Sequence, residues 1–263
     1  MTPLRVGLGL VASALFLLVL GPLRRLAQVR GWRIGRSTPV WFHRILCLAL
    51  ATRVRAIGEP SRAACRLIVS NHVGWLDIPV LGALEPMTFL AKKEIGGPFL
   101  GRQVALLQGV VFVDRERKRS IPLVNANIAR AMRAGEPVVL FAEATTGDGN
   151  RLLTFRSSHF EAIRETGGAA VVQPVYMHFR GLAGMAVARI DRPIFAWYGD
   201  TTFIPHLFQF LRHGGLSCDV HYGDPIPIEA AINRKILARQ TEQAVRALQT
   251  RARSVLSAPP ETR

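Results

Sequence analysis

The sequence has few cysteines and no pattern that would hold a metal ion. Its three cysteines, Cys47, Cys65 and Cys218, are widely spaced, and there is no CxxC pair or Cys/His cluster. An odd number of separated cysteines argues against a disulfide framework, so we expect three reduced, structural thiols and no metal site. A G-x-S-x-G motif is also absent, which argues against a serine hydrolase on an α/β sheet.

Acidic residues are scarce as well. The chain has 18 Asp and Glu against 34 Lys and Arg, a formal net charge of +16. Such a surplus implies an anionic partner, which can be nucleic acid, a membrane surface or an acidic substrate. Residues 24–66 hold ten arginines and one acid, and they follow the most apolar part of the chain. Because this placement suits an anionic membrane surface better than a duplex, we expect no nucleic-acid partner.

One long run has no charge at all. Residues 6–23, "VGLGLVASALFLLVLGPL", are 18 residues long, which is the short end of the range for a membrane-spanning helix. Two arginines follow, and no convincing cleavage site precedes them. We therefore expect residues 1–35 to form a membrane anchor with a basic flank, with a signal peptide or an interfacial helix as alternatives.

The rest of the chain alternates between short apolar runs and helical patterns, which predicts an α/β domain over residues 36–256 with a mostly parallel central sheet flanked by helices. Residues 257–263 look like a frayed tail. Strands are expected at 67–70, 87–91, 110–113, 138–141 and 170–177, and further ones near 186–190 and 217–222. Helices are expected at 78–84, 120–134 and 229–256, and residues 40–55 read as an amphipathic helix that lies on the bilayer or packs on the domain.

The stretch "SNHVGWLDIP", residues 70–79, places His72 and Asp77 five positions apart in an otherwise apolar region. A turn followed by a helix start can bring the two side chains together, and Gly74 would loosen that turn. A carboxylate bound to one imidazole nitrogen leaves the other nitrogen as a proton acceptor. A polar turn at the end of a strand is the simpler alternative.

Two later stretches place polar residues after predicted strands. In "GVVFVDRERKR", Arg115 and its basic neighbours follow a strand, an arrangement that suits an anion as well as a solvated turn. In "VVLFAEATTGDGN", Glu143 ends a strand and Thr145 follows. Ligands bind at the carboxyl ends of strands in open α/β sheets, although a helix cap or an Asp-Gly turn also explains part of this stretch.

Together these stretches resemble the glycerophospholipid acyltransferase superfamily, which includes the lysophosphatidic acid acyltransferases. The first family motif, Asn-His-x4-Asp, corresponds to Asn71-His72 and Asp77. The second is similar to Gly109, Phe112 and Arg115. The third, Phe-Pro-Glu-Gly-Thr-Arg, corresponds to residues 141–146, and the fourth, a hydrophobic strand with a proline, to residues 171–175. The four motifs occur in order between about residues 65 and 180.

The resemblance implies a reaction and a set of roles. His72 would act as general base on the acceptor hydroxyl, and Asp77 would orient it. The hydroxyl would attack a thioester of acyl-carrier protein or coenzyme A as co-substrate, with no other cofactor. Arg115, together with Lys92 or Lys93, would hold the anionic head of a lysolipid acceptor. Glu143 and Thr145 would position that head, and Gly109 belongs to the same substrate-binding set. The enzyme would work at a bacterial inner membrane, with the catalytic domain on the cytoplasmic side.

The chain departs from the family pattern at two positions, where Ala144 replaces a glycine and Thr146 replaces an arginine that helps to bind phosphate. The "GDGNR" stretch and the later "AWYGD" resemble a subgroup that includes lyso-ornithine lipid acyltransferases, whose acceptor has no phosphate. Because Arg115 and its basic neighbours are present, we expect 1-acyl-glycerol-3-phosphate as acceptor. Lyso-ornithine lipid is the alternative, and a non-catalytic membrane scaffold with a decayed site is an alternative of another class.

Overall fold

The computed structural model describes residues 34–92, 110–113, 121–168, 170–228 and 233–257, together with the single residues 7, 11, 26 and 30. Within these ranges, nine strands form one sheet. They are β1 (Arg53–Ile57), β2 (Cys65–Ser70), β3 (Thr88–Lys92), β4 (Val110–Val113), β5 (Val138–Phe141), β6 (Ala170–Leu182), β7 (Met185–Ala186), β8 (Leu216–Tyr222) and β9 (Ile226–Pro227).

The sheet is mixed but mostly parallel. Its order is β1-β8-β6-β2-β5-β3-β4, with β7 and β9 paired to β6. The pairs β1–β8, β6–β2, β2–β5, β5–β3 and β3–β4 are parallel. The long strand β6 is antiparallel to β7, β8 and β9. The predicted α/β class and parallel sheet are therefore confirmed.

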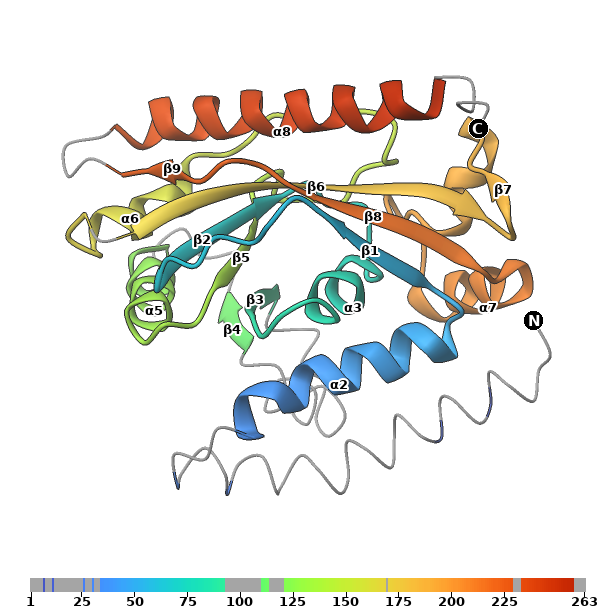
Figure 1. Cartoon of the computed structure of the whole chain (residues 1–263), viewed down its shortest axis with the longest axis horizontal. Helices are drawn as coiled ribbons and strands as arrows, with labels where there is room; N and C mark the ends of the chain where they lie inside the picture. The colour runs from blue at the N-terminus through green and yellow to red at the C-terminus, as the bar shows by residue number, and fades with distance from the viewer. Residues whose placement is uncertain are drawn as a thin grey trace, which may run out of the picture.

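Helices cover both faces of this sheet, as Figure 1 shows, with α8 along one side and α2 and α3 on the other. The helices are α2 (Ile34–Ala49), α3 (Asp77–Gly82), α5 (Ile121–Arg133), α6 (Glu161–Arg164), α7 (Phe203–His213) and α8 (Arg234–Ser257), with short 3-10 turns η3 (Ser158–Phe160) and η4 (Arg189–Ile194). Alternate residues of a strand point to opposite faces. Leu67 and Val69 of β2 therefore pack with α5, α6 and α8, whereas Ile68 packs with α3 and α7.

Most predicted elements are present, and two predictions were wrong. The helix predicted at 40–55 ends at Ala49, and residues 53–57 form β1 instead. The strand predicted near 186–190 is reduced to the two-residue β7, and the 3-10 turn η4 follows it. Helix α7 was not predicted. The three cysteines are free and buried, as expected.

Apart from residues 7 and 11, the predicted anchor at residues 6–23 lies outside the described residues. In the part of the chain that is described, no helix is both long enough and apolar enough to cross a membrane.

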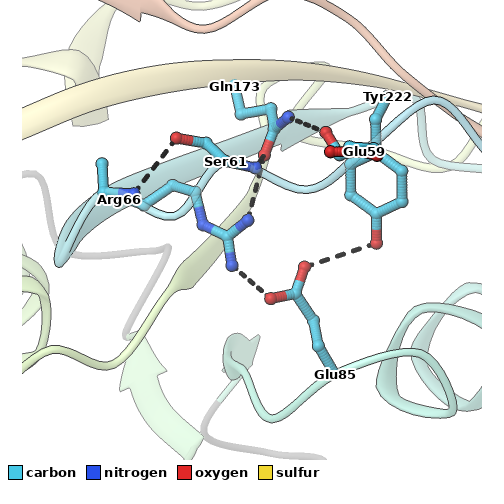
Figure 2. Close-up of polar contacts among 7 residues, drawn as sticks. Glu59, Ser61, Arg66, Glu85, Gln173 and Tyr222 are labelled. Carbon is cyan, nitrogen blue, oxygen red and sulfur yellow. Dashed lines mark hydrogen bonds and ion pairs between the residues drawn. The ribbon is translucent and has the colours of Figure 1, made fainter.

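A buried polar network ties the amino-terminal half of β2 to its surroundings (Figure 2). The guanidinium of Arg66 is buried and donates to Gln173 Oε1 at 3.0 Å and to a Glu85 carboxylate oxygen. The Tyr222 hydroxyl donates to the other Glu85 oxygen at 3.4 Å, and Gln173 Nε2 donates to the carbonyl of Glu59 at 3.0 Å. This network joins β2, β6 and β8 at the end of β2 away from His72.

Candidate active site

The candidate site forms where two neighbouring parallel strands end. In the β2–β5 pair, Ser70 is aligned with Phe141, so the residues after both strands emerge at the same edge of the sheet. The backbone N–H of Gly147 donates to the carbonyl of His72 at 2.9 Å. The structure thus brings together the first and third sequence motifs, which are about 70 residues apart in the chain.

Asn71 fixes the start of the turn that carries His72. Its side-chain oxygen accepts from the backbone N–H of Met177 at 2.8 Å, and its side-chain amide donates to the carbonyl of Met177 at 3.2 Å. The β2–β6 pairing ends at Ser70, and the Asn71 side chain continues it by bonding to the backbone of β6 in place of a backbone group. An Asn before the histidine therefore has a structural reason, which is to hold the turn against β6.

Gly74 allows a close backbone approach in the same turn. The N–H of Trp197 donates to the carbonyl of Val73 at 2.9 Å. A Cβ atom at position 74 would lie 3.0 Å from both the backbone nitrogen and the Cβ of Trp197. A side chain at position 74 would thus push away the 197 region, which covers this turn.

His72 and Asp77 form a bonded pair, as the sequence predicted. His72 Nδ1 lies 2.7 Å from Asp77 Oδ2. The same carboxylate oxygen accepts from the backbone N–H groups of Val73 and Gly74, at 2.6 and 3.0 Å. The Asp77 side chain is fully buried, whereas that of His72 is 15% exposed. Because an ionised carboxylate only accepts hydrogen bonds, this contact places the imidazole proton on Nδ1 and leaves Nε2 with a free lone pair.

A ring contact also holds the imidazole. The His72 ring stacks on Phe141, with ring centroids 4.1 Å apart and an interplanar angle of 10°. Phe141 is the last residue of β5, so a residue of the third motif supports the candidate base of the first motif. With both a carboxylate and an aromatic ring fixing its orientation, the imidazole can accept a proton from a group that reaches its exposed edge.

Glu143 is buried beside this pair and does not reach the surface. Burial, followed by the negative charge of Asp77, raises the pKa of Glu143 to about 8, although backbone hydrogen bonds from Leu153 and His72 act in the opposite direction. A carboxyl group in this position is suited to holding the loop and the backbone of His72. Among the described residues, Glu143 lines a recess beside His72 with a volume of about 10 Å³. Its predicted role in positioning the acceptor head group remains a prediction.

The third motif continues into an exposed turn at Ala144 and Thr145. Ala144 has φ of +60°, in the left-handed region that glycine adopts without cost. A glycine at this position of the family motif would adopt this backbone conformation without strain, whereas Ala144 adopts it at a cost in free energy. Thr145 is exposed and Thr146 is half-buried, so Thr145 is open to solvent at the end of β5.

The predicted acceptor-binding residues of the second motif fall largely outside the described residues. Gly109 and Arg115 lie there, as does Lys93. Strand β4 ends at Val113 and β3 at Lys92. Strand β3 is parallel to both β4 and β5, so the carboxyl ends of β3 and β4 lie at the same edge of the sheet as Glu143. The roles predicted for Gly109, Arg115 and Lys92 remain predictions.

Several residues near His72 were not singled out from the sequence. Tyr176, Gln249 and Arg151 line the recess together with His72 and Glu143. Phe141 was noted only as part of a motif, and its stacking on His72 was not foreseen. The available signals were the "GDGNR" stretch and the Arg- and Gln-rich face of the last helix, since both pack here.

Comparisons with known proteins agree with this geometry. The protein family described as Acyltransferase matches residues 53–178. A lyso-ornithine lipid O-acyltransferase from Brucella abortus is 42% identical to this chain over 83% of each protein. Another from Rhizobium meliloti is 40% identical over 87% of this chain and 80% of the relative. Among solved structures, the 1-acyl-sn-glycerophosphate acyltransferase PlsC from Thermotoga maritima has the same fold, with a TM-score of 0.65 and 15% identity over 98% of this chain and 97% of that one.

The family match includes the His72–Asp77 pair, Glu143 and Met177, whose backbone binds the Asn71 side chain. The two relatives extend the similarity to more than four fifths of the chain. The chain therefore belongs to the acyltransferase family, within the glycerophospholipid acyltransferase superfamily that its motifs resemble.

Proposed function

We propose that this acyltransferase moves a fatty acyl group from a thioester donor to the hydroxyl of a lysolipid, and that the lysolipid is lyso-ornithine lipid. The observation that carries the choice of acceptor is the identity of 40–42%, over most of the chain, to two relatives with that activity in their names. The acceptor expected from the basic residues alone, 1-acyl-glycerol-3-phosphate, becomes the second candidate.

The third motif supports the same choice. Thr146 stands where the family pattern has an arginine that helps to bind phosphate. An ornithine head group carries a carboxylate and an amine and contains no phosphate, so a cation at that position is not needed. The observation that favours the second candidate is the set of four basic residues between Arg115 and Arg119, which suits a phosphate monoester.

His72 is the general base in this proposal. Its Nε2 accepts the proton of the acceptor hydroxyl as the oxygen attacks the carbonyl carbon of the thioester. Asp77 stabilises the imidazolium that forms, and it does so without becoming protonated itself. Collapse of the tetrahedral intermediate breaks the carbon–sulfur bond, and the proton on Nε2 passes to the departing thiolate. No serine or cysteine nucleophile is required.

The proposed location is a membrane, with the catalytic domain on the cytoplasmic side of a bacterial inner membrane. The uncharged run at 6–23 and the arginines after it support this location. The acceptor and product are lipids, and the donor, acyl-carrier protein or acyl-coenzyme A, is water-soluble. Deleting residues 1–23 is expected to release the protein from membranes. Continued sedimentation of the shortened, folded protein with the membrane fraction would place the attachment elsewhere in the chain.

The function is tested by offering labelled acyl-carrier protein and acyl-coenzyme A thioesters with either lyso-ornithine lipid or 1-acyl-glycerol-3-phosphate. The His72→Ala variant serves as the blank. We expect product from lyso-ornithine lipid with the native enzyme and none with the variant. Product from the phosphate acceptor alone would replace the proposed acceptor by the second candidate. Absence of product from both acceptors would favour the non-catalytic scaffold.

A further inference from the structure

Two arginines from distant parts of the chain converge on the loop that follows β5. Arg192, in η4, donates from Nη1 to the carbonyl of Gly149 at 2.7 Å. Arg253, near the end of α8, donates from Nη2 to the carbonyl of Asn150 at 2.8 Å and lies 3.4 Å from that of Gly149. Both residues lie beyond the family match at 53–178.

Within the described residues, neither arginine forms an ion pair with a carboxylate. Asp148, in the same loop, accepts hydrogen bonds from the backbone N–H and the side-chain amide of Asn150, at 2.8 and 2.9 Å. Burial lowers the pKa of Arg192 and the charge of Arg253 acts in the same direction, whereas Tyr176 and Asp148 act in the opposite one. In the described residues, hydrogen bonds hold the two guanidinium groups to carbonyl oxygens, and Asp148 offsets at most one of the two positive charges, so an anion would neutralise the other.

The arginine pair lies close to the candidate base. A Cβ atom at Gly149 would lie 2.9 Å from Arg192 Nη1 and 3.4 Å from Val73 Cγ1, and Gly149 has φ of +70°. Arg192 thus touches the loop at the point where the loop contacts the residue after His72. Gly149 also lines the recess beside His72. The arginine pair thus holds the same residue, Gly149, that lines the recess beside His72.

We propose that Arg192 and Arg253 form an anion subsite that binds the carboxylate of the acceptor head group and so places the acceptor hydroxyl at His72. This inference rests on the proposed function. It also fits the threonine at position 146, because η4 and α8 would supply the positive charge that the family arginine supplies after β5. The planar guanidinium groups match a carboxylate as well as a phosphate.

The first arm of the test changes the substrate and leaves the protein intact. Native enzyme is assayed with lyso-ornithine lipid and with its carboxamide derivative, in which the carboxylate is neutral. We expect the acceptor KM to be about 10- to 100-fold higher for the carboxamide, the range for loss of charge-assisted hydrogen bonds. Equal KM values for the two acceptors would overturn the proposal.

The second arm changes the arginines. Arg192→Gln and Arg253→Gln are each expected to raise the KM for lyso-ornithine lipid at least tenfold and to leave the donor KM within about twofold. The same variants should have little effect with the carboxamide, since the interaction is already lost. Arg192→Lys keeps the charge and should restore most of the acceptor affinity. A rise in the donor KM alone would assign the pair to the phosphate groups of the donor and overturn the proposal.

The matched control is Arg251→Gln, which removes the same charge from an exposed position of the same helix. It should leave both KM values unchanged, and an acceptor KM raised as much as in Arg253→Gln would attribute the effect to the general charge of α8. If the native enzyme uses 1-acyl-glycerol-3-phosphate instead, the proposed acceptor fails, and the same variants are assayed with that lipid. A raised acceptor KM would then retain the anion subsite, and an unchanged one would reject it.

Discussion

The charge of Asp77 can be removed while its oxygen stays in place, by the substitution Asp77→Asn. The oxygen that contacts His72 also accepts the N–H groups of Val73 and Gly74. These two donors require an acceptor, so the asparagine should place its carbonyl oxygen there and its amide nitrogen at the other position. The imidazole would keep its Nδ1 proton and its orientation, and only the negative charge beside it would be lost.

The expected loss of activity follows from the separation of the two charges. A carboxylate and an imidazolium about 4 Å apart interact by about 4 kcal/mol at an effective dielectric constant of about 20. The transition state has received only part of the proton, so about 2 to 4 kcal/mol of stabilisation is removed. This corresponds to a decrease in kcat/KM of about 30- to 1,000-fold. Asp77→Ala also removes the oxygen that fixes the tautomer, and its decrease should be at least tenfold larger.

The assay is acyl transfer to the acceptor that the native enzyme uses, at a temperature where each variant is folded by circular dichroism. The position that would receive the asparagine amide, Asp77 Oδ1, is buried and has no hydrogen-bond partner in the described structure. We therefore expect a loss of about 1–3 kcal/mol in the free energy of unfolding as well, which makes the folding check necessary.

The matched control is Asp219→Asn, another buried aspartate, which pairs with Arg55 at 2.7 Å and Arg180 at 3.1 Å on the sheet. It should lower stability without changing kcat/KM. A decrease below threefold in Asp77→Asn would refute the electrostatic role of Asp77. A decrease equal to that of Asp77→Ala would show that the N–H groups of Val73 and Gly74 do not keep the asparagine oxygen against His72, and so would refute the argument that this oxygen fixes the His72 tautomer.

Three further predictions concern stability. Burial raises the pKa of Glu143 to about 8, so between the usual carboxyl pKa and pH 8 the folded state holds a proton that the unfolded state has released. The free energy of unfolding should therefore fall by about 1.4 kcal/mol per pH unit as pH rises through that range. Glu143→Gln should flatten this decline in urea titrations between pH 6 and 7.5, and an unchanged slope would contradict a raised pKa at Glu143. Ala144→Gly should relieve the strain of the left-handed backbone at this position, but glycine also raises the entropy of the unfolded chain. We therefore expect the free energy of unfolding to rise by about 0 to 1 kcal/mol, and a clear decrease would show that the Ala144 methyl group is needed. Glu85→Ala should lower the free energy of unfolding by about 3–5 kcal/mol, because it leaves the buried charge of Arg66 without its carboxylate partner. A decrease below 1 kcal/mol in urea denaturation would mean that the polar network around Arg66 contributes little to stability.

Elements with a strong local pattern were predictable from the sequence. Strands β4 and β5 are continuous apolar runs with clear ends, and the structure places them at the predicted residues. The short elements and the chain between 49 and 57 were not predictable in this way. "TRVRAI" has an alternation that suits a strand, but the preceding apolar helix pattern runs into it without a glycine or proline. Only the pairing of β1 with β8, which is more than 150 residues away in the chain, decides its structure.

The sequence by itself determined the residue types and the local spacing of the site, because a turn between a strand and a helix is enough to bring His72 and Asp77 into contact. Tertiary structure alone decided what surrounds that pair. The stacking of Phe141, the burial of Glu143 and the approach of Arg192 and Arg253 all depend on which strand ends become neighbours in the sheet and on which helices cover them. The physical reason is that the chemistry of a side chain is a local property, whereas its burial, its neighbours and the charge around it are set by contacts between distant segments.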